Sequence, residues 1–84
     1  MFYTYAISSL TRNYIYIGLP SDIDRRLSEH NSGKNKTTKP YLPFVLIYSE
    51  MHETRSEARE REKYFKSGIG REKLRSIRDN RING

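Results

Sequence analysis

The sequence contains no cysteine, only two histidines and no long apolar run. Without cysteine, neither a disulfide framework nor a thiolate metal site can stabilise the chain. Two histidines are too few for a histidine-rich zinc site. No apolar stretch approaches the ~20 residues that cross a bilayer, and no segment resembles a signal peptide. We therefore expect a cytoplasmic protein with no membrane partner.

The chain has 84 residues, a net charge of +6 and a pI near 9.8. This length predicts one domain, residues 1–84, whose stability rests on a single small core. The excess of positive charge favours a polyanionic partner, with nucleic acid ahead of membrane. Its distribution supports this choice, because the loop of residues 31–41 holds Lys34, Lys36 and Lys39 but no acid, and a basic tail begins at Arg71. We take these four residues as candidate nucleic-acid contacts.

Two short segments near the start of the chain have the alternation of β-strands. Residues 2–8 put Tyr5 on one face together with Tyr3 and Ile7, and residues 14–18 oppose two tyrosines to two isoleucines. The polar residues 9–13 between them suit a hairpin connection. The sequence therefore predicts a β-hairpin with a tyrosine-rich face.

The next segments predict a helix and then a strand. Ser21 suits the N-cap of a helix that ends near Asn31, where Asn-Ser-Gly follows. The continuous apolar run of residues 44–48 is typical of a strand covered on both faces, so we expect it in the middle of the sheet.

The last third of the chain predicts two helices. Residues 54–57 have the capping-box spacing, and the helix that follows ends by Gly68. A final helix over residues 71–78 offers Leu74 and Ile77 to the core. The expected fold is an α/β (α+β) domain with a central three-stranded, mainly antiparallel sheet flanked by helices, in the order β-β-α-β-α-α.

Two charged residues break the local apolar patterns. Arg26 borders the inward stripe of its helix, where an arginine usually lays its stem on apolar neighbours and keeps its guanidinium in water. Glu62 stands between Ala58 and Phe65 at helical spacing, in the centre of an apolar stripe. A carboxylate there needs an arginine, a metal or a raised pKa, so a structural ion pair with Arg26 or another base competes with a functional role.

Seven tyrosines in so small a domain are mostly expected as core aromatics, and the tripeptide Tyr16-Ile17-Gly18 carries little weight alone. The residues that follow this tripeptide in the sequence carry more weight. An arginine follows that tyrosine by ten residues on the next helix, and Glu62 stands within a later helix. The ordered set resembles the GIY-YIG nuclease family, in particular its small single-domain bacterial members. Tyr3-Thr4-Tyr5 matches the first signature in its tyrosine only, and Tyr16-Ile17-Gly18 matches the second fully.

The resemblance implies a metal-dependent endonuclease that hydrolyses phosphodiester bonds in DNA and leaves a 5′-phosphate and a 3′-hydroxyl. Glu62 would bind one divalent cation, Mg²⁺ or Mn²⁺, and Arg26 would stabilise the phosphate. Tyr16 and His30 together would activate the attacking water, with Tyr5 assisting by a hydrogen bond.

Two departures from the family pattern concern binding. Some members have a lysine soon after the second signature, where this chain has Leu19-Pro20-Ser21, so Lys34 or Lys39 would have to substitute. The larger members also carry separate DNA-recognition domains, so a protein partner that supplies specificity is one alternative here. A second alternative is a non-catalytic nucleic-acid-binding domain that retains the nuclease fold.

Overall fold

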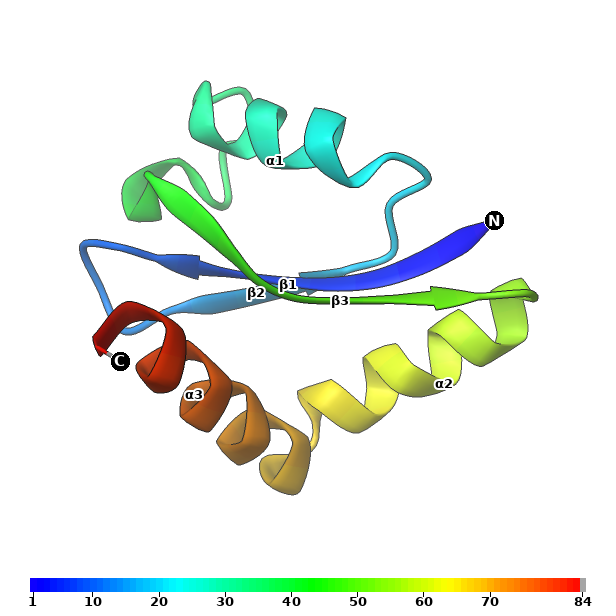
Figure 1. Ribbon diagram of the computed structural model, residues 1–84. Helices are drawn as coiled ribbons and strands as arrows, with labels where there is room; N and C mark the ends of the chain where they lie inside the picture. The colour runs from blue at the N-terminus through cyan, green and yellow to red at the C-terminus, as the bar shows by residue number, and fades with distance from the viewer. Residues whose placement is uncertain (84) are drawn as a thin grey trace.

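The computed structural model describes residues 1–83 and has a three-stranded sheet with helices on both of its faces (Figure 1). Its elements are β1 (Phe2–Ser9), β2 (Ile15–Gly18), α1 (Ile23–Asn31), the short 3₁₀ helix η1 (Lys39–Tyr41), β3 (Phe44–His52), α2 (Arg55–Lys66) and α3 (Gly68–Asn83). The predicted fold class and element order are confirmed, with η1 as an addition.

The strand order in the sheet is β2-β1-β3, and both pairings are antiparallel. The expectation that residues 44–48 form the middle strand is therefore wrong, because β1 pairs with β2 on one edge and with β3 on the other. The apolar run in β3 has another cause. Helices cover both faces of the sheet, so even this edge strand buries Phe44 towards α1 and Ile47 towards α2 and α3.

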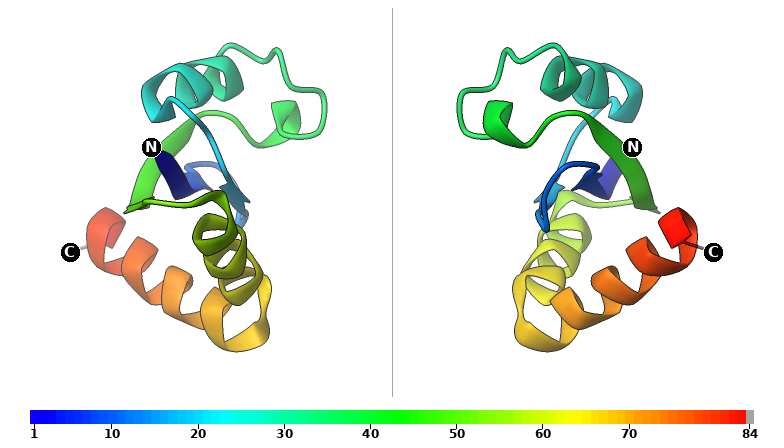
Figure 2. Two further views of the ribbon diagram at one scale, coloured as in Figure 1. Left: turned by 90° about the vertical axis from the view of Figure 1, so that its right-hand side faces the viewer. Right: turned by 90° about the vertical axis from the view of Figure 1, so that its left-hand side faces the viewer.

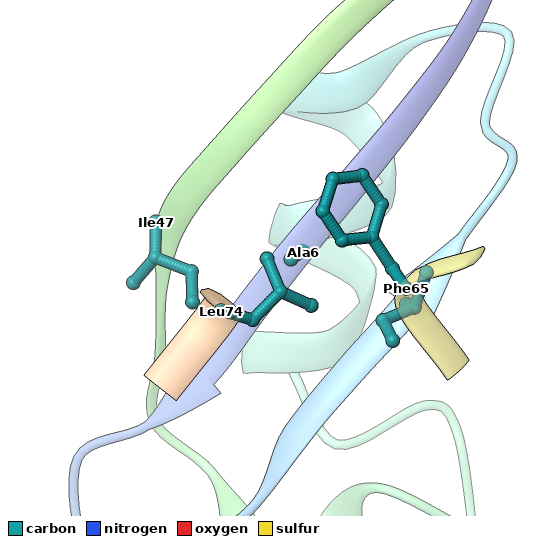
Figure 3. Close-up of a cluster of buried hydrophobic side chains, with 5 residues drawn as sticks. Ala6, Ile47, Phe65 and Leu74 are labelled. Carbon is teal, nitrogen blue, oxygen red and sulfur yellow. The ribbon is translucent and has the colours of Figure 1, made fainter. Parts of the chain in front are cut away.

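Two apolar clusters hold the three layers together. On the α1 face, Tyr5, Ile7 and Phe44 are buried with partly buried residues of α1 packed against them. On the opposite face, the buried cluster consists of Ala6, Ile17, Ile47, Phe65 and Leu74 (Figure 3). The predicted hairpin faces are confirmed, because Tyr5 and Ile7 lie on one side of β1 and Ala6 lies on the other.

The helix ends follow from local sequence. Asp22, one residue after the predicted Ser21, is the N-cap of α1 and accepts a hydrogen bond from the Arg25 amide at 3.1 Å. Gly33, with φ +78°, follows the C-terminal end of α1. Thr54 caps α2 through the Glu57 amide, as the capping box predicts. None of the helices within residues 1–83 is both long and apolar enough to cross a membrane.

A buried polar contact joins three elements beneath α2. Thr4 of β1 donates from Oγ1 to the carbonyl oxygen of Ala58 at 3.2 Å, and Oγ1 of Thr4 also lies 2.9 Å from Nε2 of His52. Because the threonine hydroxyl has one hydrogen, His52 donates in this arrangement. The contact fixes α2 against the sheet, and α2 is the helix that carries Glu62.

The corner between α2 and α3 depends on a glycine. A Cβ at Gly70 would lie 2.0 Å from the carbonyl oxygen of Tyr64 and 2.6 Å from Cα of Phe65. We expect Gly70→Ala to lower the free energy of unfolding by about 3 kcal/mol, because rigid backbone must move to admit the methyl group. Urea denaturation measures the loss. Gly68→Ala is the matched control, since its Cβ would meet no atom within 4 Å and should be neutral or stabilising. Equal losses of unfolding free energy in the two variants would contradict the packing role assigned to Gly70.

Candidate active site

The two signature tyrosines meet across the β1–β2 hairpin. Tyr5 is opposite Gly18 in the register, and its ring meets that of Tyr16 edge to face, with centroids 6.4 Å apart and planes at 88°. A Cβ at Gly18 would lie 2.6 Å from Cε1 of Tyr5. The glycine of the second signature thus leaves room for the tyrosine of the first.

Helix α1 brings Arg26 and His30, one helical turn apart, over the same tyrosines. The His30 ring lies 4.8 Å from the Tyr16 ring and 6.5 Å from the Tyr5 ring, measured between centroids. Arg26 is close enough to Tyr5 to affect its pKa. These four residues form one cluster on the α1 face of the sheet, which we call the tyrosine cluster.

The Tyr5 hydroxyl is buried without a hydrogen-bond partner among the described residues, in a side chain that is 1% exposed. Burial and the nearby Tyr16 raise the pKa of Tyr5 to about 12, although the Arg26 guanidinium opposes part of the rise. Tyr5 therefore keeps its proton at neutral pH and is available as a donor. A buried hydroxyl without a partner costs stability, so this hydroxyl is open to a hydrogen bond with a bound water or ligand.

His30 is likewise buried, and only one of its ring nitrogens has a partner. Nδ1 lies 2.8 Å from Oγ1 of Thr38, whereas Nε2 has none among the described residues. Burial, and then the charge of Arg26, lower the pKa of His30 below its ordinary value. The imidazole is therefore neutral at pH 7, with Nε2 free to accept a proton when Nδ1 donates to Thr38.

The lowered pKa of His30 makes stability depend on pH. Well above pH ~6.5 the imidazole is neutral in both the folded and unfolded states and contributes no dependence. As the pH falls below that value, the unfolded state takes up a proton that the folded state resists. We expect the free energy of unfolding to fall with it, until the folded-state pKa is passed.

Urea denaturation from about pH 8 to about pH 5 checks this expectation, with His30→Gln as the comparison. The variant should lose the part of the pH dependence that His30 causes. An identical pH profile in both proteins would contradict the assignment, since the remaining histidine, His52, is present in each.

Arg26 is half-exposed and pairs with Glu29, with Nη1 and Oε2 3.3 Å apart. Burial tends to lower its pKa, but Tyr5, Glu29 and Tyr16 together raise it above the ordinary value. Arg26 therefore stays cationic. The partly exposed guanidinium of Arg26 agrees with the snorkelling interpretation. In addition, its charge lies near enough to the buried Tyr5 to affect the pKa of that tyrosine.

Glu62 lies on the other side of the sheet, on α2. Its flanking positions Ala58 and Phe65 are each 1% exposed, while its own side chain is 25% exposed. Of the ion-pair alternatives, the partner is Lys66 and not Arg26, with Nζ of Lys66 3.2 Å from Oε2 of Glu62. An i,i+4 pair at this exposure contributes only a few tenths of a kcal/mol, so another cation or ligand can displace it.

A groove of about 430 Å³ runs beside the edge strand β2, between it and the helices α2 and α3. Tyr16 and Gly18 line one side, and Glu62, Lys66 and Arg71 line the other. Tyr16 is therefore the residue that belongs both to the tyrosine cluster and to the wall of the Glu62 groove. The edge strand is where chemistry from the two faces of the sheet can meet.

Comparison with known proteins agrees with this geometry. The model of the GIY-YIG catalytic domain matches residues 1–75. This chain belongs to the GIY-YIG family. UPF0213 proteins of Staphylococcus aureus strains Mu50 and N315 are each 41% identical to it over 66 residues, which are 77% of this chain and 80% of theirs. The solution NMR structure of a UPF0213 protein from Bacillus halodurans is 32% identical, with a TM-score of 0.54, over 92% of this chain and 85% of that one.

The GIY-YIG metal site can be compared with the donors present in this chain. Within residues 1–83, no group of three or more histidine, aspartate and glutamate side chains is arranged to hold an ion. Glu62 is the one acid lining the groove, and its Oε1 has no partner among the described residues. One open carboxylate fits Mg²⁺, which keeps most of its waters and takes phosphate oxygens as further ligands. It does not fit a preformed cage for Ca²⁺ or Zn²⁺.

The structure separates the residues predicted to bind nucleic acid. Lys34, Lys36 and Lys39 are exposed in or beside the loop of residues 31–41, which lies with α1 on one side of the sheet (Figure 2). Arg71 is exposed at the start of α3 on the opposite side and lines the groove. None of the three lysines lines the groove, so their role in binding stays a prediction. Leu19, where some family members have a lysine, does line it.

Sequence reasoning missed four residues that contact the site. Glu29 and Lys66 stand three and four residues after Arg26 and Glu62, so helical spacing could have found both. Arg75 stands four residues after Arg71 and lines the same groove. Thr38 had no local signal, because its contact with His30 depends on how the loop folds back.

Proposed function

We propose that this chain is a metal-dependent endonuclease that hydrolyses phosphodiester bonds in DNA at the edge of β2. The observation that carries the proposal is the position of Tyr16, which contacts the His30 ring on one side and lines the Glu62 groove on the other. A phosphodiester beside Tyr16 would lie between a neutral base, an arginine and a carboxylate. These are the groups that metal-assisted hydrolysis requires.

Glu62 would hold one divalent cation, Mg²⁺ or Mn²⁺, by its carboxylate. When bound, such an ion polarises the scissile phosphate and stabilises the leaving oxygen. In the free protein Lys66 pairs with Oε2 of this carboxylate, and the weak pair must open before both carboxylate oxygens are available to an ion. Lys66 would then be free to contact the substrate.

His30 and Tyr16 would activate the attacking water as a pair. Nε2 of His30 has no partner within residues 1–83 and the ring is neutral near pH 7, so Nε2 can take the proton. His30 itself is 1% exposed, whereas Tyr16 is half-buried at the groove. The Tyr16 hydroxyl would therefore orient the water. It would accept a proton from the water while it gives its own proton to Nε2 of His30. Tyr5, which keeps its own proton, would donate a hydrogen bond to the water or to a phosphate oxygen.

Arg26 would neutralise the charge that grows on the nonbridging oxygens as the water attacks. Its raised pKa keeps it cationic, and Glu29 limits the positions of its guanidinium. The planar guanidinium can contact two oxygens at once, which an ammonium cannot do in the same way.

The role of Tyr5 predicts opposite effects on stability and activity. Tyr5→Phe removes a buried hydroxyl that has no hydrogen-bond partner in the described part of the chain, so we expect the free energy of unfolding to stay equal or rise by up to about 1 kcal/mol. The cleavage rate should fall about 10- to 100-fold, because the donor is lost. Urea denaturation and single-turnover kinetics measure the two quantities. A stability loss of several kcal/mol with an unchanged rate would make Tyr5 a core residue only.

The proposal is tested by incubating the protein with labelled duplex, flap, hairpin and single-stranded DNA in Mg²⁺, Mn²⁺ or EDTA. We expect metal-dependent cutting that EDTA prevents, with 5′-phosphate and 3′-hydroxyl ends. Binding without cutting on every substrate would overturn the nuclease and favour a nucleic-acid-binding domain. The observation in favour of that second function is the Lys66 contact, which neutralises Glu62 in the free protein.

A further inference from the structure

The wall of the groove beyond Glu62 carries three cations in a row. Lys66 is at the end of α2, and Arg71 and Arg75 follow on α3. Arg71 and Arg75 are one turn apart, which separates them by about 6 Å along the helix. Leu74, between them in sequence, is fully buried and anchors α3 to the core. We call Lys66, Arg71 and Arg75 the basic wall.

The contacts of the basic wall leave most of its charge available. Arg71 donates from Nε to the carbonyl oxygen of Lys66 at 3.1 Å, which fixes the side chain near the corner of α2 and α3. Arg75 is exposed and makes no hydrogen bond or ion pair with any residue of the described chain. Lys66 has only the weak pair with Glu62, which is the one acid lining the groove. The groove therefore has an excess of positive charge facing β2.

The opposite wall of the groove is the exposed edge of the hairpin, with Asn13, Tyr14 and Ile15 along it. Tyr14 lines this wall, and its ring is stacked on Tyr41 with 4.0 Å between centroids. A basic wall facing aromatic and polar groups is the arrangement that single-stranded nucleic acid uses, with phosphates on the cations and bases towards the rings.

We propose that the basic wall binds the backbone of one unpaired strand of nucleic acid and leads it along β2 to Glu62. This inference rests on the proposed function, because it supplies the substrate strand to that site. The volume of about 430 Å³ is that of a small-ligand site, and it suits a single strand better than a duplex, which would be wider than the groove. Neighbouring phosphates of one strand would contact Arg71 and Arg75.

The test measures binding in EDTA, so that no cleavage is needed. A labelled single-stranded oligonucleotide is titrated by fluorescence anisotropy at about 50 to about 200 mM salt. Replacing Lys66, Arg71 and Arg75 together by alanine should reduce the slope of log affinity against log salt by about 2, at ~0.7 for each contact. Over that salt range the wild-type protein would then lose about 20-fold more affinity than the variant.

Arg75→Ala alone is the second variant, because Arg75 has no partner among residues 1–83 and its loss leaves the α2–α3 corner intact. It should reduce the slope by about 0.7. Lys73→Ala is the matched control, since Lys73 is exposed on the same helix but does not line the groove. Its slope should equal that of the wild type.

Unchanged slopes in both basic-wall variants would overturn the inference. Equal affinity and equal slope loss with a duplex of the same sequence would overturn the assignment to an unpaired strand. The outcome is independent of the nuclease. Binding through the basic wall without any cleavage would leave this inference standing and remove the proposed function, whereas cleavage by a basic-wall variant with wild-type binding would do the reverse.

Discussion

Arg26→Ala is expected to slow single-turnover cleavage about 100- to 1,000-fold, while affinity for the uncut substrate changes by less than about ten-fold. The guanidinium lies near Tyr5 and Tyr16 and stays cationic, and in the proposed reaction it would interact mainly with charge that grows only in the transition state. Rate and affinity are measured separately, the first with excess protein and the second in EDTA.

Arg25→Ala is the matched control for Arg26. Arg25 is the preceding residue, with a side chain 78% exposed, and it also pairs with Glu29, at 3.7 Å. Its removal should leave the rate within about two-fold of the wild type. Arg26→Lys keeps the charge but loses the planar guanidinium, and it should recover only part of the rate. Equal losses of rate and affinity in Arg26→Ala would make Arg26 a binding residue and no more.

Glu62→Gln should reduce metal-dependent cleavage by about 1,000-fold or more, a loss of about 4 kcal/mol of transition-state stabilisation. The amide has nearly the shape of the carboxylate but no charge to hold a divalent cation. The fold should be unchanged, because the only ion pair lost is the weak, half-exposed one with Lys66. Binding of nucleic acid should be equal or stronger, since a negative charge leaves the groove.

Glu60→Gln controls for the change of charge on α2. Glu60 is exposed on the same helix and does not line the groove, so its substitution should leave the rate unchanged. Circular dichroism and urea denaturation of both variants check the fold. Full turnover by Glu62→Gln would remove Glu62 from the metal role and leave its pairing with Lys66 as its function.

The order of elements, the cap of α2 and the end of α1 could be predicted because their signals are local, whereas the N-cap of α1 was predicted one residue early, at Ser21 and not Asp22. The capping box at Thr54 and the glycine after the first helix each act within a few residues. The place of β3 in the strand order could not be predicted. An apolar run indicates that both faces of a strand are buried, but it does not indicate which strand pairs with it. The shift of the β1–β3 register between Ala6 and Ile7 also has no signal in the local sequence. The last helix begins at Gly68, before the predicted start at residue 71. Gly70 in its first turn packs closely against Tyr64 and Phe65, and the sequence does not report this tertiary contact.

The candidate site residues named from sequence lie on both faces of the sheet, and this division was not predictable. Tyr5, Arg26 and His30 lie with α1, and Glu62 lies on α2, with Tyr16 between them. The pKa directions of Tyr5 and His30 depend on burial that sequence does not report. The separation of the loop lysines from Arg71 likewise depends on topology, because charge patterns do not reveal which face a loop covers.

The most direct test of the central claim is a titration of the cleavage rate with Mg²⁺, for the wild-type protein and Glu62→Gln on the same labelled DNA. We predict a rate that rises with Mg²⁺ to a plateau in the wild type, is absent in EDTA and stays near background in Glu62→Gln at every Mg²⁺ concentration. Cleavage that persists in EDTA, or an identical Mg²⁺ curve for the two proteins, would contradict the claim that Glu62 and one bound cation cut the strand at the edge of β2.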